Sequence, residues 1–341
     1  MTSIQHGEST AAPITAQNSW SAHIRATLML GLPLIGAQLA QMLMGVTDTL
    51  MLGWLGTEAL AASVLGTNIL FVLMITGFGF GTAVSALAAG AEGAGDVRGV
   101  RRVVRMGLWV SILFGILAMP IMFFAEEILL AIGQEPGLSA VADDYLAIAR
   151  WSLFPALIII VLRNFLSVLS RAGIVLIFTF IAAVLNGLLN YMLIFGNWGA
   201  PALGVEGAAW ATLGSNVFSM LLLLVCVTRH KAVQKYEVLV RFWRADWPAF
   251  AEVFKIGWPI GLTLLAEVGL FSFSAVMMGW FGQVPLAAHG ISLQLASISF
   301  MIPLGLSQAA TVRIGIAAGR GDALGVHRAG FVILLMGGGV A

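Results

Sequence analysis

A single aspartate, Asp48, interrupts the apolar stretch "MLMGVTDTLMLGWLG" at residues 42–56. A second acid, Glu267, lies inside another apolar stretch, "LLAEVGLF". A carboxylate in the middle of a membrane helix costs roughly 2.5–3.5 kcal/mol on insertion scales. Burial disfavours the charged form, so such a group is suited to taking up a proton or a cation. Each acid is therefore a candidate for its own cation or proton site, although hydrogen bonds between helices would also explain it.

Amide and hydroxyl side chains could complete such a site. Asn186 and Asn190, in "LNGLLNY", are four residues apart and therefore lie on one face of a helix. They could bind a carboxylate or a cation, or they could simply join two helices. Gln41 and Thr212 are weaker candidates of the same kind.

The composition indicates that these residues lie in a membrane protein. Of the 341 residues, 60% are hydrophobic and only 10% are charged, whereas a soluble domain has about 25% charged residues. The net charge of +1 provides no basic field for nucleic acid. The sequence contains no Walker-A loop, no catalytic motif and no Cys/His metal spacing, so we expect neither an enzyme nor a resident cofactor.

Apolar stretches of about 20 residues can cross a membrane as helices. The predicted spans lie near residues 27–52, 59–89, 103–124, 146–169, 174–195, 204–228, 250–281 and 285–316, and a ninth begins near residue 326. Lys and Arg occur before the first span and after the second, fourth, sixth and eighth spans, while the intervening loops contain none. This alternation follows the positive-inside rule and predicts a cytoplasmic N-terminus.

The sequence contains an internal repeat. The segment that begins at Pro33 aligns without gaps to the segment that begins at Pro259, an offset of 226 residues. Shared motifs include MxGWxG, LAA and GxGD, the last of which reads GAGD at 93–96 and GRGD at 319–322 and is interpreted as a turn. An even number of spans separates the two units, so the repeat is parallel, with its axis along the membrane normal.

These residues resemble the multidrug and toxic compound extrusion (MATE) family, particularly its NorM-like bacterial branch. The resemblance rests on "GVTDT", "LNGLLNY", "NWGAPALGVEGAAWAT", "LLAEVGLF", "AAHGISLQ" and "RIG", and it runs from about Leu28 to the end of the chain. It implies an all-α polytopic membrane protein built from two pseudo-symmetric six-helix bundles. The repeat then places the end of this chain about two and a half spans into the second bundle.

The expected organisation is a disordered cytoplasmic tail at 1–26, an N-terminal six-helix bundle at 27–228, a cytoplasmic linker at 229–249 and an incomplete C-terminal bundle at 250–341. The resemblance implies a monomeric antiporter in the bacterial inner membrane. It would export cationic drugs across the lipid bilayer in exchange for Na⁺ or H⁺.

The resemblance also assigns roles to residues. Asp48 matches the family's first-span acid, with Asn186, Asn190 and Thr212 around it, and Glu267 matches the acid of a second-lobe cation site. That second site also uses a later acid, which this chain does not contain.

The alternative function is a flippase for lipid-linked oligosaccharides of the same superfamily. A cavity rich in Arg and Lys would favour it. In this sequence Arg150 and Arg163 are expected near the ends of the fourth span.

Overall fold

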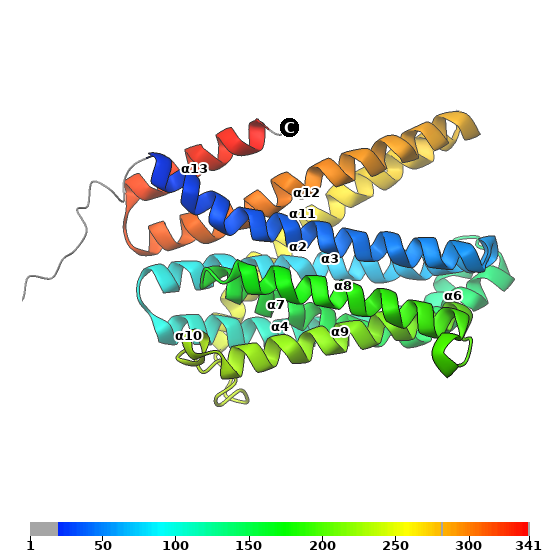
Figure 1. The fold of residues 1–341 in the computed structure, drawn as a ribbon, viewed down its shortest axis with the longest axis horizontal. Coiled ribbons are helices and arrows are strands. Elements are labelled where there is room, and N and C mark those ends of the chain that lie inside the picture. The colour runs from blue at the N-terminus through cyan, green and yellow to red at the C-terminus, as the bar shows by residue number, and fades with distance from the viewer. Residues whose placement is uncertain (1–19, 281, 340–341) are drawn as a thin grey trace, which may run out of the picture.

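The computed structural model describes residues 20–280 and 282–339, and in this part of the chain the regular structure is entirely helical (Figure 1). The helices are α2 Trp20–Leu55, α3 Thr57–Gly93, α4 Val97–Phe123, α5 Ala125–Ala131, α6 Pro136–Ala149, α7 Leu153–Val168, α8 Ala172–Phe195, α9 Gly204–Arg229, α10 Lys231–Gln234, α11 Trp247–Trp280, α12 Gln283–Gly319 and α13 Ala323–Gly338. Short 3₁₀ turns at Arg150–Ser152 and Asn197–Gly199 complete the described elements.

Within the described residues, eight helical segments are long and apolar enough to cross a membrane, in agreement with the predicted spans. The fourth span is composite, because α6 and α7 together cover Pro136–Val168. Two predicted boundaries were wrong. Helix α2 begins at Trp20, so residues 20–26 are helical rather than part of a disordered tail. Helix α11 begins at Trp247, inside the predicted linker, which itself contains α10. Residues 1–19 lie outside the described part of the chain.

The two GxGD segments form turns of the same geometry. Gly95 and Gly321 have φ values of 72° and 69°, in the left-handed region that favours glycine. The following residues, Asp96 and Asp322, cap α4 and α13, and each carboxylate accepts a hydrogen bond from the backbone N–H three residues later, at 2.9 and 2.8 Å. The interpretation of GAGD as a turn is therefore confirmed, and the matching geometry is consistent with the repeat.

Helices α11 and α12 pack against α2 and α3 over only part of their length. Figure 1 shows them crossing the first bundle at one end and diverging from it at the other. In α12, Ala309 and Val312 are buried, whereas Ile291 is 66% exposed. In α11, Leu270 is likewise 64% exposed. The two lobes therefore touch at the end that carries the Arg-rich loops and open toward the opposite end.

Glycines form the contact between the lobes. A Cβ atom on Gly79 of α3 would collide with the carbonyl oxygen of Gly257 and the backbone nitrogen of Gly261 in α11. A Cβ atom on Gly261 would in turn collide with the carbonyl oxygen of Thr76. Small residues allow such close helix packing in membranes, where dispersion contacts replace the hydrophobic effect.

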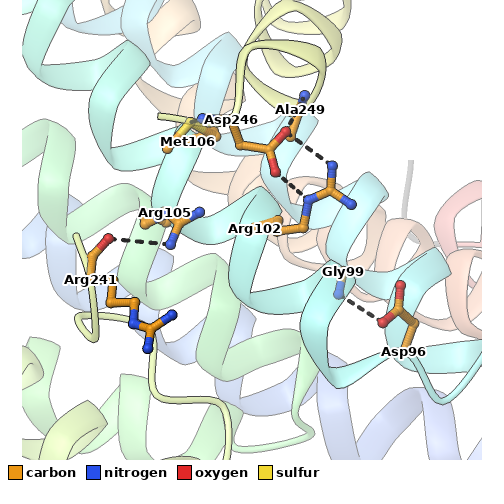
Figure 2. A network of polar contacts seen from close by, with 8 residues as sticks. All are labelled: Asp96, Gly99, Arg102, Arg105, Met106, Arg241, Asp246 and Ala249. Atoms are coloured by element: carbon orange, nitrogen blue, oxygen red, sulfur yellow. Dashed lines mark hydrogen bonds and ion pairs between the residues drawn. The ribbon is translucent and has the colours of Figure 1, made fainter. Parts of the chain in front are cut away.

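The linker between the lobes is bound to α4, as Figure 2 shows. Arg102 forms a two-point ion pair with Asp246. Arg105 donates a hydrogen bond to the carbonyl oxygen of Arg241 at 3.3 Å, and the backbone N–H of Asp246 donates to the sulfur of Met106 at 3.3 Å. These contacts fix the position at which α11 leaves the first lobe.

Further contacts extend this attachment along the linker. The indole N–H of Trp109 donates to the carbonyl oxygen of Phe242 at 3.0 Å. Arg101 donates to the carbonyl oxygen of Tyr236 and to the carboxylate of Glu237, both at 2.7 Å. The linker is therefore part of the first lobe rather than a loose connection between the two.

The close contact between Gly261 and Thr76 predicts that Gly261→Ala destabilises the protein. The added methyl group has to push α11 away from Thr76, and such overpacking costs about 1–3 kcal/mol. We expect a lower unfolding temperature in detergent. The control is Gly269→Ala on the same helix, where the new methyl group meets nothing within 4 Å. Equal unfolding temperatures for the two variants would contradict a tight contact between the lobes.

The ion pair between Arg102 and Asp246 should make the stability of the protein depend on pH. The hydrogen bond from Arg102 lowers the pKa of the Asp246 carboxyl below its ordinary value of 3.8, and the N–H of Ala249 adds to this, while burial opposes it. Because the pKa is lowered on folding, the ionised carboxylate stabilises the folded protein at pH values above the pKa of Asp246 in the unfolded chain. This stabilisation is lost as the pH falls through the folded pKa.

Asp246→Asn should therefore lower the unfolding temperature at pH 7, and should lower it less at pH 3, which is below the unfolded pKa of 3.8. The loss in free energy of unfolding should be about 1 kcal/mol or less, because Arg102 is half exposed. Thermal unfolding in detergent at both pH values measures this difference. The exposed Asp144→Asn serves as the control. A loss of the same size at both pH values would rule out the ion pair as its cause.

Candidate functional site

The carboxylate of Asp48 lies half-buried on α2 and is held by α8. Its Oδ1 atom accepts a hydrogen bond from the amide nitrogen of Asn190. Helix α2 continues for seven residues beyond Asp48 to Leu55, which is about 10 Å at 1.5 Å per residue. Asp48 therefore sits inside its span, on the side where the lobes diverge.

Behind Asp48, the polar contacts continue from α8 to α9. The amide nitrogen of Asn190 also donates to Oδ1 of Asn186 at 3.1 Å, and the amide nitrogen of Asn186 donates to the hydroxyl of Ser215 at 3.4 Å. That hydroxyl donates to the carbonyl oxygen of Thr212 at 3.0 Å. Both asparagines are fully buried. The predicted pair on one helix face thus forms a continuous chain with Asp48, which we call the Asp48 network.

One buried oxygen of the Asp48 network has no hydrogen-bond donor among the described residues. The nitrogen of the Asn190 amide must face the carboxylate, so its Oδ1 atom points away from it. That oxygen is buried and accepts no hydrogen bond from the described residues. An unsatisfied buried acceptor costs about 1–3 kcal/mol. Carboxylate and amide oxygens are ligands that hard cations prefer, so this position is suited to a cation or a proton donor.

The other predicted site residues do not join the Asp48 network through their side chains. Thr212 contributes its carbonyl oxygen, but its hydroxyl makes no hydrogen bond among the described residues. Gln41 accepts a hydrogen bond from Arg163 instead, at 2.7 Å. Glu267 is exposed on α11 and has no hydrogen-bond partner in the described part of the chain. The structure therefore brings Asp48, Asn186 and Asn190 together and leaves Glu267 apart in the second lobe.

Two polar contacts of the first lobe were not predicted from the sequence. Ser215 follows Thr212 by three residues, so a search for polar residues on one helix face would have found it. Arg163 lies near the end of its span, as expected, five residues before α7 ends at Val168. Its guanidinium contacts Gln38 and Gln41 of α2, which the sequence did not predict. An arginine inside an apolar stretch was the available signal.

Comparisons with known proteins give consistent results. The MatE family model matches residues 33–192 and 259–341. The probable multidrug resistance protein NorM of Rhizobium meliloti is 52% identical over 326 residues, covering 96% of this chain and 70% of that protein. The protein of the same name from Agrobacterium fabrum is 50% identical over 327 residues, with the same coverage of 96% and 70%.

Solved structures share the fold. The eukaryotic MATE transporter AtDTX14 has a TM-score of 0.84 at 19% identity, covering 93% of this chain and 70% of that chain. An outward-facing multidrug resistance MATE family transporter of the MOP superfamily has a TM-score of 0.83 at 20% identity, covering 96% and 72%. At these identities the likeness shows the arrangement of helices, and the two-bundle interpretation of the sequence agrees with it.

The Asp48 network makes a prediction for Asn190→Leu. Without the amide, the Asp48 carboxylate loses its donor, and the free energy of unfolding in detergent should fall by about 1–3 kcal/mol. The same substitution should cost less in an Asp48→Asn background, because no charge is then left unpaired. Asn164→Leu is the control, since this half-buried amide on α7 makes no hydrogen bond among the described residues. Additive effects of the two substitutions would contradict direct coupling between Asp48 and Asn190.

Proposed function

Since the chain belongs to the MatE family, the multidrug and toxic compound extrusion transporters, we propose that it exports cationic drugs in exchange for inward-moving Na⁺ or H⁺. Eight apolar helices within residues 20–280 and 282–339 make it a multi-pass membrane protein. The names of its relatives support multidrug export as the activity, and they do not favour the flippase alternative. No resident cofactor is proposed, because the coupling ion is itself a substrate.

The observation that carries the proposal is the carboxylate of Asp48, which lies inside an apolar bundle and is held there by the amide nitrogen of Asn190. A proton or a Na⁺ ion bound to the carboxylate would neutralise its charge. Neutralisation lowers the cost of enclosing the site in hydrocarbon, so it favours a conformation in which α2, α8 and α9 close around it.

The membrane potential supplies energy for this cycle. One inward positive charge is worth about 2.3 kcal/mol per 100 mV. The ion can bias the transporter only if it binds the two conformations with different affinities. A carboxylate that is accessible in one conformation and enclosed in the other meets this condition.

The proposed orientation has the Arg-rich loops and the N-terminus in the cytoplasm of a bacterial inner membrane. The lobes then touch at the cytoplasmic side and diverge toward the outside, and Asp48 lies about 10 Å from the outer end of α2. In this state Asp48 would load a cation from outside. We propose a monomer as the transporting unit, with Glu267 as the acid of a cation site in the second lobe.

The test is ethidium efflux from cells that express the protein or its Asp48→Asn or Glu267→Gln variant. Removing the carboxylate removes the exchangeable charge, so each variant should lose at least about tenfold in efflux rate at equal membrane abundance. Proteoliposomes with either a Na⁺ or a proton gradient then identify the coupling ion. Asp144→Asn, an exposed acid outside the Asp48 network, should transport normally. Undiminished efflux in both acid variants would show that these carboxylates are structural.

A further inference from the structure

A cavity of about 550 Å³ lies where the two lobes meet at the Arg-rich end of the molecule. It is bounded by α2 of the first lobe and by α12 and α13 of the second, which pack against one another there (Figure 1). Its volume falls in the range of ligand sites, about 300–1,000 Å³. His23, which lines the cavity, precedes Asp48 by 25 residues on α2, or about 37 Å along the helix. The cavity is therefore separate from the Asp48 network.

The wall of this cavity is part apolar and part polar. Its apolar part includes Met29, Leu30, Val312 and Ala329. Its polar part consists of His23, Ser170, Arg313, Arg320 and Asp322. Met29 is 67% exposed, so the cavity reaches the outer surface of α2. A wall of this kind suits a ligand that has both a polar head and an apolar chain.

The hydrogen bonds of His23 show which ring nitrogen carries its proton. The Nη2 atom of Arg313 lies 3.0 Å from Nδ1 of His23. A guanidinium can only donate, so Nδ1 accepts and the ring proton is on Nε2. The side chain of His23 is 8% exposed, and its Nε2 atom is buried without a partner among the described residues. A buried donor that lacks an acceptor is costly, so His23 has an N–H group that an oxygen atom of a ligand would satisfy.

The charged groups that line the cavity leave an excess of positive charge. Arg313 joins the lobes, because it also donates to the hydroxyl of Thr27 and to the carbonyl oxygen of His23, the latter at 2.9 Å. The side chain of Arg320 is exposed and has no hydrogen bond or ion pair with another described residue. Asp322 is the one acid among the described lining residues, and its carboxylate caps α13. Two guanidinium groups and one carboxylate favour an anionic ligand.

A smaller cavity of about 240 Å³ adjoins the first and shares Arg320 with it. It adds two basic residues, Arg171 and Lys235, and one acid, Glu92. Arg320 therefore lies between two cavities that both carry more positive than negative charge.

We propose that the larger cavity binds an anionic phospholipid, with its phosphate at Arg320 and His23 and an acyl chain along Met29 and Leu30. Arginine forms strong charge-assisted hydrogen bonds with phosphate, and basic pockets between transmembrane helices bind anionic lipid headgroups. The apolar wall favours a lipid over a free phosphate ion. Because the donors come from both lobes, the bound lipid stabilises the arrangement in which the lobes touch here. This inference goes beyond drug export and does not depend on it.

The test measures thermal unfolding of the purified protein in detergent as dioleoyl phosphatidylglycerol is added to the micelles. The lipid should raise the unfolding temperature until the site is saturated. Arg320→Gln should raise the half-saturating mole fraction of this lipid at least about tenfold, which corresponds to about 1.4 kcal/mol, and the control Arg98→Gln less than about twofold. Arg98 is an exposed arginine that lines neither cavity, so the control makes the same change in net charge.

A second variant, His23→Asn, keeps an acceptor for Arg313 and removes the Nε2 donor. It should also weaken the effect of phosphatidylglycerol, measured against its own unfolding temperature without lipid. Dioleoyl phosphatidylcholine, with the same chains and no net charge, should stabilise the wild-type protein less. No stabilisation by phosphatidylglycerol, or equal shifts for Arg320→Gln and Arg98→Gln, would overturn the site. Stabilisation by inorganic phosphate alone to the same extent would overturn the lipid as its ligand.

Discussion

The hydrogen bond between Asp48 and Asn190 is the interaction on which the first lobe depends. Hydrocarbon offers a carboxylate no water, so the charge on α2 has to be met by a donor from another helix. Asn190 supplies that donor, and through Asn186 and Ser215 the contact continues to α9. Three helices are thereby held in register by a group that is costly to bury. Any change in the charge of Asp48 alters the packing of all three.

The contact between the lobes restricts how the second lobe can move relative to the first. Gly79, Gly257 and Gly261 bring the backbones of α3 and α11 together, and the linker is attached to α4 by Arg102 and Asp246. Relative motion of the lobes therefore has to break glycine contacts at the Arg-rich end while α11 still starts from a fixed point. Packed helices of this kind have discrete arrangements rather than a continuous range. A change of charge at Asp48 can shift the balance between two such arrangements.

The sequence predicts the spans well because apolar length alone determines them. It does not predict the start of α2 at Trp20, since the helix extends beyond the apolar stretch into polar residues. Asn186 and Asn190 could be assigned because their spacing fixes a shared face. The partnership of Arg163 with Gln41 could not, because it depends on how α2 and α7 are placed by other helices. The exposure of Glu267 likewise depends on packing partners that local sequence does not specify.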